Sequence, residues 1–279
     1  MTAPLWPLTP PRTPEEVWAA SYPDFVAMVN QTNVMPGAFS TLNTWALQSR
    51  MGKHSTLLDV ACTTGFTSRE LASLTSCEAV GFDLAADAVA VATYNHAHHH
   101  THLDLDYVHA DGMSFTPRRR FTHIAVGAAL GFFPDPNAMA ERLVGFLAEG
   151  GYLLASPYWS EDELPSEIAE LRKNVFGITS PLPTRSAAMA PFRGLRTLHE
   201  EDHQPASESE ADLATYCVAT INRVCRQAQI TVAPVREAMI ERLRGIKDAT
   251  NRLRPHLRYT TLVSAYDSAE YPHRYVELF

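Results

Sequence analysis

Cysteines are few in this sequence, and long apolar runs are missing. Its four cysteines, Cys62, Cys77, Cys217 and Cys225, include no CxxC pair, so we expect no disulfides and a reducing, cytoplasmic location. No window reaches about 18 consecutive apolar residues, so no membrane span is predicted. The opening segment, MTAPLWPLTPPRTP, has no continuous apolar stretch, and we therefore expect no secretory signal.

Basic residues are also fewer than acidic ones. The chain has 23 Lys and Arg residues against 31 Asp and Glu residues, which gives a net charge of -8. A surface with this balance repels phosphate backbones, so we expect no nucleic-acid partner. The one basic run, residues 118–120, precedes an apolar stretch and indicates a solvated loop. Because 46% of the residues are hydrophobic, the chain can still bury a sizeable core.

Short apolar runs alternate with helical stretches through the first half of the chain. The runs are residues 56–61, 78–83, 105–110, 121–129 and 151–157, and helices are expected near 67–75, 85–98 and 137–148. This alternation predicts a parallel sheet built from repeated strand–helix units. Two earlier helices are expected over residues 13–30, capped by Thr13, and 39–50. The pair Gly150 and Gly151 is the predicted end of the helix before the fifth strand.

The second half of the chain is less regular. After Pro157 the alternation stops for roughly a hundred residues, which is long for a connection between strands and indicates an insertion. Two helices within it carry apolar stripes that predict either core or dimer packing, so a homodimer is one expectation. The stripes are Leu213, Cys217, Ile221 and Val224, and Val235, Met239, Leu243 and Ile246. The β-rich runs 257–267 and 274–279 predict a terminal antiparallel hairpin.

Three aspartates end the first three predicted strands. Asp59 precedes a tight turn and a helix, for which Thr67 and Glu70 form a predicted capping box. Asp83 ends the second strand, where a carboxylate can accept two ribose hydroxyl groups. Asp111 ends the third. Ligands bind outside the carboxyl ends of parallel strands, so we expect this edge to hold a nucleoside-containing cofactor.

With these residues the chain resembles the class I S-adenosylmethionine-dependent methyltransferases, whose first motif is an acidic residue followed by a Gly-x-Gly-x-Gly turn. The resemblance covers residues 56–157 well. It implies that S-adenosylmethionine is the cofactor and that no metal is needed. The cofactor residues it implies are Asp59, Ala61, Thr63 and Gly65 in the first motif, Asp83 and Leu84 at the ribose, Asp111, Gly112 and Met113 at the adenine, and Ala128 after the fourth strand.

Two motif glycines are replaced, by Ala61 and Thr63. Neither residue adopts positive φ cheaply, so we expect right-handed backbone at both, or a cofactor held slightly farther away. A dinucleotide-binding oxidoreductase is the less favoured alternative, because a pyrophosphate needs glycine where Thr63 stands. A non-catalytic binding module on the same fold is a further alternative.

The resemblance also implies the architecture. We expect a Rossmann-like α/β fold with a mostly parallel seven-stranded sheet, an antiparallel C-terminal strand, and a helical cap inserted between strands five and six. The corresponding division is an N-terminal arm and helical lid over 1–50, a methyltransferase core over 51–160 and 255–279, and a substrate cap over 161–254.

The acceptor is expected to be a small molecule of specialised metabolism, methylated on carbon, nitrogen or oxygen. An aromatic or indole-like compound is the first hypothesis, with substrate contacts from Tyr22, Phe25, Leu130, Tyr158 and Trp159. His199 and Glu200 are the candidate general bases.

Several other side chains leave alternatives open. Three arginines keep a phosphorylated or carboxylated acceptor open: Arg185, Arg193 and Arg196. The histidines between His96 and His102 indicate a solvated helix end rather than a metal site.

Overall fold

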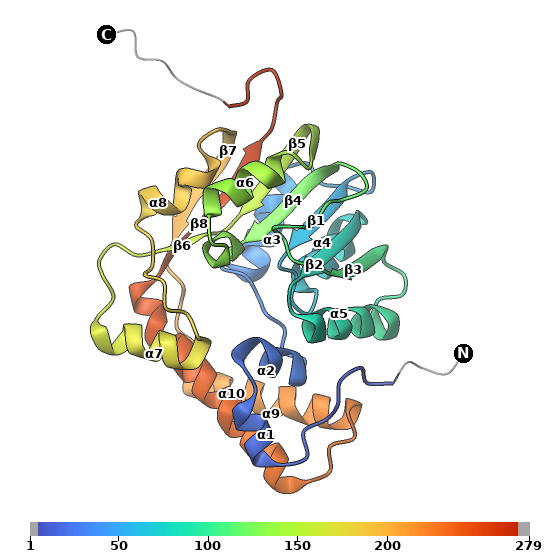
Figure 1. Cartoon of the computed structure of the whole chain (residues 1–279), viewed down its shortest axis with the longest axis vertical. Coiled ribbons are helices and arrows are strands. Elements are labelled where there is room, and N and C mark those ends of the chain that lie inside the picture. The colour runs from blue at the N-terminus through green and yellow to red at the C-terminus, as the bar shows by residue number, and fades with distance from the viewer. Residues whose placement is uncertain (1–4, 273–279) are drawn as a thin grey trace.

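A computed structural model describes residues 5–272 of the chain (Figure 1). Its centre is an eight-stranded sheet with the order β3-β2-β1-β4-β5-β8-β6, in which β7 also pairs with β8. The strands are β1 (Thr56–Val60), β2 (Glu78–Asp83), β3 (Leu105–His109), β4 (Phe121–Gly127), β5 (Leu147–Ala155), β6 (Tyr158–Trp159), β7 (Arg196–His203) and β8 (Arg258–Ala265).

The first five strands are parallel, and β8 runs antiparallel to β5, β6 and β7. The strand order turns back between β1 and β4, which is the switch point where open α/β sheets bind ligands. The predicted Rossmann-like fold, with its mostly parallel sheet and antiparallel C-terminal strand, is confirmed.

Apolar side chains cover both faces of the sheet, as parallel strands require. Leu57 packs in one cluster with α3 (Ala38–Gln48) and α4 (Phe66–Thr75). Its neighbour Leu58 packs in the opposite cluster, with Met139 and Leu143 of α6 (Pro136–Val144). Successive side chains of a strand point to opposite faces, so β1 joins the two halves of the core. The helix α5 (Ala86–His99) follows β2 and runs beside β3.

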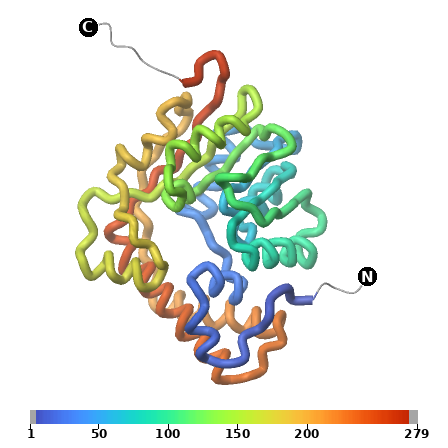
Figure 2. The backbone as a smooth tube through the Cα atoms, in the orientation of Figure 1, coloured from blue at the N-terminus to red at the C-terminus, as the bar shows by residue number. Residues whose placement is uncertain are grey.

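A second, helical layer lies beyond the carboxyl ends of the parallel strands (Figures 1 and 2). It contains α1 (Pro14–Ala19), α2 (Tyr22–Met28), α7 (Ser166–Phe176), α9 (Glu210–Gln227) and α10 (Ala233–Leu253). Most of the predicted apolar stripe residues of α9 and α10 meet each other and Phe25 in one buried cluster. These stripes are therefore core within one chain and supply no surface for the expected homodimer, which stays a prediction. Figure 2 follows the chain from α2 back to the sheet.

The insertion differs from its prediction. We expected one helical cap between the fifth and sixth strands, but β7 divides the region, so α9 and α10 stand between β7 and β8. The part before β7 contains α7, α8 (Arg185–Met189) and the short helix η2 (Ala190–Phe192). Strand β7 is polar and largely exposed, so it lacks the apolar alternation that predicts a strand.

Two local predictions were also wrong, and a third falls on residues that the structure does not describe. The expected helix over 13–30 is broken into α1 and α2 because Pro23 lacks the backbone N–H that a continuous helix would need. The predicted glycine cap at Gly150 and Gly151 lies inside β5, and α6 ends at Val144 with Gly145 as its cap. The second run of the predicted terminal hairpin, 274–279, lies outside the described residues.

The remaining short elements are the 3-10 helices η1 (Ala129–Phe132) and η3 (Arg254–His256). All four cysteines are free and buried, so the expected absence of disulfides holds. Within residues 5–272, no helix is both long and apolar enough to span a membrane. Over the same range, no group of three His, Cys, Asp or Glu side chains is placed to hold a metal ion.

Candidate cofactor and acceptor site

The turn after β1 has left-handed backbone at alternate residues. Values of φ are 56° at Ala61, 48° at Thr63 and 81° at Gly65. The expectation of right-handed backbone at Ala61 and Thr63 was therefore wrong. A non-glycine residue costs about 1–2 kcal/mol in this region, and the turn is held by hydrogen bonds that it donates to the neighbouring strand β2. The Thr63 N–H donates to Asp83 Oδ2 at 2.9 Å, and the Cys62 N–H donates to the Phe82 carbonyl at 3.0 Å.

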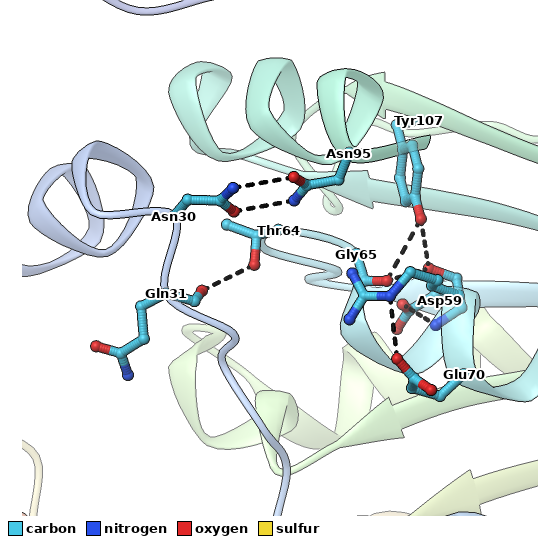
Figure 3. Close-up of polar contacts among 10 residues, drawn as sticks. Asn30, Gln31, Asp59, Thr64, Gly65, Glu70, Asn95 and Tyr107 are labelled. Atoms are coloured by element: carbon cyan, nitrogen blue, oxygen red, sulfur yellow. Dashed lines mark hydrogen bonds and ion pairs between the residues drawn. The ribbon is translucent and has the colours of Figure 1, made fainter. Parts of the chain in front are cut away.

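Asp59 fixes the helix that follows this turn. Its Oδ2 accepts a hydrogen bond from the Ser68 N–H at 2.9 Å, so the carboxylate of β1 caps the first turn of α4. The side chain is 3% exposed, and burial, with a contribution from the nearby Asp83, raises the pKa of Asp59 to about 7. The predicted capping box is wrong, because α4 begins at Phe66 and Glu70 instead pairs with Arg69 at 3.0 Å (Figure 3).

Asp83 ends β2 beside the same turn. Besides the bond from Thr63, its Oδ1 accepts the Ala85 N–H at 2.8 Å, and the residue remains 9% exposed. An ionised carboxylate has about four lone-pair sites, so these two bonds leave acceptor capacity for a ligand. The structure thus orients Asp83 through its backbone partners while keeping it able to accept hydroxyl groups.

Large apolar side chains are exposed after the carboxyl ends of β2, β3 and β4. Leu84 follows β2 and is 69% exposed, Met113 follows β3 and is 41% exposed, and Phe132 follows β4 and is 69% exposed. Between them, Asp111 is exposed and accepts the Met113 N–H at 2.9 Å. Gly112 is required by packing, because a Cβ there would lie 2.8 Å from the Phe133 ring. Exposed apolar groups beside a few fixed polar atoms are typical of ligand sites.

Comparison with known proteins agrees with this geometry. Residues 57–151 match the family model of a methyltransferase domain. This part of the chain is therefore a methyltransferase domain. S-adenosylmethionine is the cofactor of such domains, and no curated protein matches the chain in sequence.

Solved structures share the fold of this methyltransferase domain at low identity. The MccD protein is 24% identical, with a TM-score of 0.66 over 85% of this chain and 100% of MccD. A SAM-dependent methyltransferase from Geobacter sulfurreducens, solved with S-adenosyl-L-homocysteine, is 16% identical, with a TM-score of 0.62 over 86% of this chain and 96% of that one. The cyclase SpnF is 14% identical, with a TM-score of 0.61 over 92% of this chain and 98% of SpnF. Such identities establish the fold and not the reaction.

Aromatic side chains from five elements make two groups of ring contacts. Tyr22 of α2 packs edge-on against Phe176 of α7 at 5.1 Å, and Tyr158 of β6 meets Tyr259 of β8 at 6.4 Å. His203, the last residue of β7, stacks on Tyr259 at 4.9 Å. Burial raises the pKa of both Tyr22 and Tyr158 to about 12, although both side chains keep some exposure. Both are therefore neutral phenols at physiological pH.

Three predicted substrate residues are buried in the core instead. Phe25 is fully buried under the Arg242 guanidinium, at 4.4 Å. Leu130 packs in the core cluster beside α6, and Trp159 donates from Nε1 to Thr260 Oγ1 at 3.0 Å. The predictions for Phe25, Leu130 and Trp159 are therefore corrected, whereas Ala128 lies where expected, between β4 and η1.

The predicted bases lie on β7, which is separated from the parallel strands by β8. His199 pairs with Val263, four residues before β7 ends at His203. Glu200 is paired with Arg185 at 2.5 Å. Sequence reasoning missed Tyr259, because only the strand register brings it opposite Tyr158.

Residues 30–37 fall within the lid expected over 1–50, but the sequence did not indicate what this segment contacts. This segment crosses the carboxyl edge of the sheet, and its main contacts join residues far apart in the chain. Gln31 and Asn95 are examples, and neither carried a sequence signal.

Proposed function

We propose that the protein transfers a methyl group from S-adenosylmethionine to a small aromatic or indole-like acceptor, on carbon, nitrogen or oxygen. The observation that carries the proposal is Asp83. Its carboxylate is fixed by Thr63 and Ala85 and retains free lone pairs. The exposed side chain of Leu84 follows it in the chain, and the exposed Met113 lies beyond the end of the neighbouring strand β3. A ribose diol and an adjoining purine match a carboxylate flanked by apolar surface.

The cofactor residues then divide by the part of the ligand they would hold. Asp83 would accept the ribose hydroxyls, while Leu84, Met113 and Asp111 would border the adenine. The turn containing Ala61, Thr63 and Gly65, with Ala128, would meet the amino-acid half. Asp59 would act indirectly, by holding the start of α4. When bound, the cofactor supplies a methyl group on a positively charged sulfur.

The acceptor side favours a neutral or cationic aromatic compound. Tyr22 and Tyr158 offer ring faces and neutral hydroxyls, and ring faces attract cations. An anionic acceptor is less favoured, because Arg185 is already paired with Glu200 at 2.5 Å and with Asp202 at 2.6 Å. Arg193 is bonded to Ser186 at 2.7 Å.

Arg196, the third arginine considered for an anionic acceptor, begins β7 opposite Ala265. It therefore lies at the end of β7 away from His203. The aromatic hypothesis is accordingly preferred to a phosphorylated or carboxylated acceptor.

Alignment and exclusion of water are the main tasks of these residues. Methyl transfer is an in-line displacement, so holding the acceptor atom opposite the sulfur supplies most of the rate enhancement. The helical layer and the tyrosines would enclose the acceptor. A strong base is not required for a neutral amine or an electron-rich carbon.

Calorimetric titration with S-adenosylhomocysteine tests the proposal. Asp83→Asn keeps the size of the side chain but removes its charge, and should weaken binding about tenfold or more, as expected when a charge-assisted hydrogen bond is lost. The matched control is Asp87→Asn, an exposed aspartate four residues further along, which should bind like wild type. Absence of heat with S-adenosylmethionine and S-adenosylhomocysteine, together with binding of NAD, would overturn the assignment.

A further inference from the structure

A strap of eight residues, 30–37, links the helical layer to α3 across the carboxyl edge of the sheet. Residues 31–35 form neither helix nor strand. The strap touches the turn after β1, where Thr64 Oγ1 donates to the Gln31 carbonyl at 2.9 Å. Further on, Met35 Cβ lies 3.6 Å from the position of a Cβ on Gly127, at the end of β4. The strap therefore spans both sides of the switch point between β1 and β4.

The first residue of the strap is held by a buried amide pair. Asn30 Nδ2 donates to Asn95 Oδ1, and Asn95 Nδ2 donates to Asn30 Oδ1, both at 3.0 Å (Figure 3). The two residues are 6% and 8% exposed. From α9, Arg223 donates to the Asn30 carbonyl at 2.7 Å. Asn30 has φ of 47°, a left-handed conformation that asparagine tolerates better than most residues.

The second residue of the strap carries an unpaired polar group. Gln31 is 3% exposed, and its side-chain Oε1 has no hydrogen-bond partner among the described residues. Its side chain points away from Thr64, to which its own carbonyl is bonded (Figure 3). A buried acceptor left unpaired costs free energy, and native proteins rarely keep one without a ligand or water to satisfy it. A water molecule or a bound ligand beside the strap would satisfy this oxygen.

We propose that Asn95 is a positioning residue for the cofactor: through Asn30 it fixes the strap that closes over the turn after β1. The inference rests on the proposed function, because it assigns the strap to the cofactor site. Asn95 sits on α5 and acts only through Asn30. Opening the strap requires both of these hydrogen bonds to break, and also the longer one from Asn30 Nδ2 to Gln227 Oε1 at 3.3 Å, so loss of the amide pair should let a bound cofactor leave faster.

Two single variants remove the pair from opposite sides. Asn95→Ala deletes one amide, and Asn30→Gly deletes the other while preserving the left-handed backbone and the carbonyl that accepts from Arg223. We expect each to raise the dissociation rate of S-adenosylhomocysteine about tenfold, the effect of two neutral hydrogen bonds. Association should be no slower than in wild type. The double variant should dissociate no faster than either single one, because the pair acts as a unit.

Asn251→Ala is the control. Asn251 also makes an amide hydrogen bond, to the Glu208 carbonyl at 2.8 Å, but it lies on α10 and has no contact with the strap. It should leave both rate constants unchanged. Unaltered dissociation in Asn95→Ala, or effects of the two amide variants that simply add, would refute the positioning role. If the substitutions only destabilised the fold, association would become slower and the melting temperature would fall with it.

Hydrogen exchange of the ligand-free protein separates this inference from the proposed function. Amides of residues 30–37 should exchange faster in Asn95→Ala than in wild type, whatever the ligand is. Failure of wild type to bind S-adenosylhomocysteine would refute the proposed function alone. Unchanged exchange over the strap would refute the positioning role of Asn95, even in a protein that binds the cofactor normally.

Discussion

Replacing Asp59 with asparagine should change the pH dependence of stability rather than simply weaken the fold. The asparagine side chain would keep an oxygen for the Ser68 N–H, which now donates to Asp59 Oδ2 at 2.9 Å, and it has nearly the same volume. It differs from aspartate because it cannot ionise. In wild type, burial and the nearby Asp83 raise the pKa of Asp59 from 3.8 to about 7.

Proton linkage gives the sign and the size of this pH effect on the free energy of unfolding. Between pH 4 and 7 the native state holds a proton on Asp59 that the unfolded state has lost, so the contribution of this group to stability falls as pH rises. The contribution is complete below the unfolded pKa and lost as pH passes the folded one. A slope of about 1.4 kcal/mol per pH unit between pH 5 and 7 amounts to about 3 kcal/mol, which is an upper bound.

Urea unfolding of the ligand-free protein at pH 5 and pH 8 measures this effect. From pH 5 to pH 8, the free energy of unfolding of Asp59→Asn should rise relative to that of wild type by up to about 3 kcal/mol. The groups that face Asp59 are Asp83, Cys62 and Tyr107, and they are unchanged in the variant. A difference in free energy of unfolding that stays constant from pH 5 to 8 would refute the reasoning, because it would mean that Asp59 is already ionised at pH 5.

Two further predictions concern the turn after β1. Gly65→Ala should lower the free energy of unfolding by about 2 kcal/mol or more. The φ of Gly65 is 81°, and a Cβ there would lie 2.4 Å from the Tyr107 hydroxyl. Urea unfolding measures this, and a variant with the wild-type midpoint would contradict it. Thr63→Gly should raise the free energy of unfolding by up to about 1 kcal/mol, because the strain energy that is removed exceeds the entropy cost of a more flexible unfolded chain. A loss of stability of similar size in thermal unfolding would show that Thr63 is not strained.

The strand ends were predictable because their signals are local. Each of Asp59, Asp83 and Asp111 directly follows or ends a short apolar run, and the carboxyl ends of parallel strands meet at one edge. The alternation alone therefore placed them near the switch point. It did not say what each carboxylate bonds. Asp59 turned out to cap α4, a role that depends on where the helix starts.

Features set by distant contacts could not be predicted. The left-handed backbone at Thr63 is held by Asp83, which lies on another strand, and propensity alone argued against it. The pairing of β7 with β8 could not be predicted, because an exposed strand rich in charge carries no apolar alternation that would assign it to the sheet. The Asn30–Asn95 pair joins residues 65 positions apart, and no pattern in either segment indicates the other.

The central claim is that Asp83 holds the nucleoside of the cofactor. A crystal structure of the protein with S-adenosylhomocysteine tests it most directly. The account predicts both ribose hydroxyls within hydrogen-bonding distance of the Asp83 carboxylate, with the adenine between Leu84 and Met113. A nucleoside bound elsewhere, or an Asp83 that contacts only Thr63 and Ala85 in the complex, would contradict it.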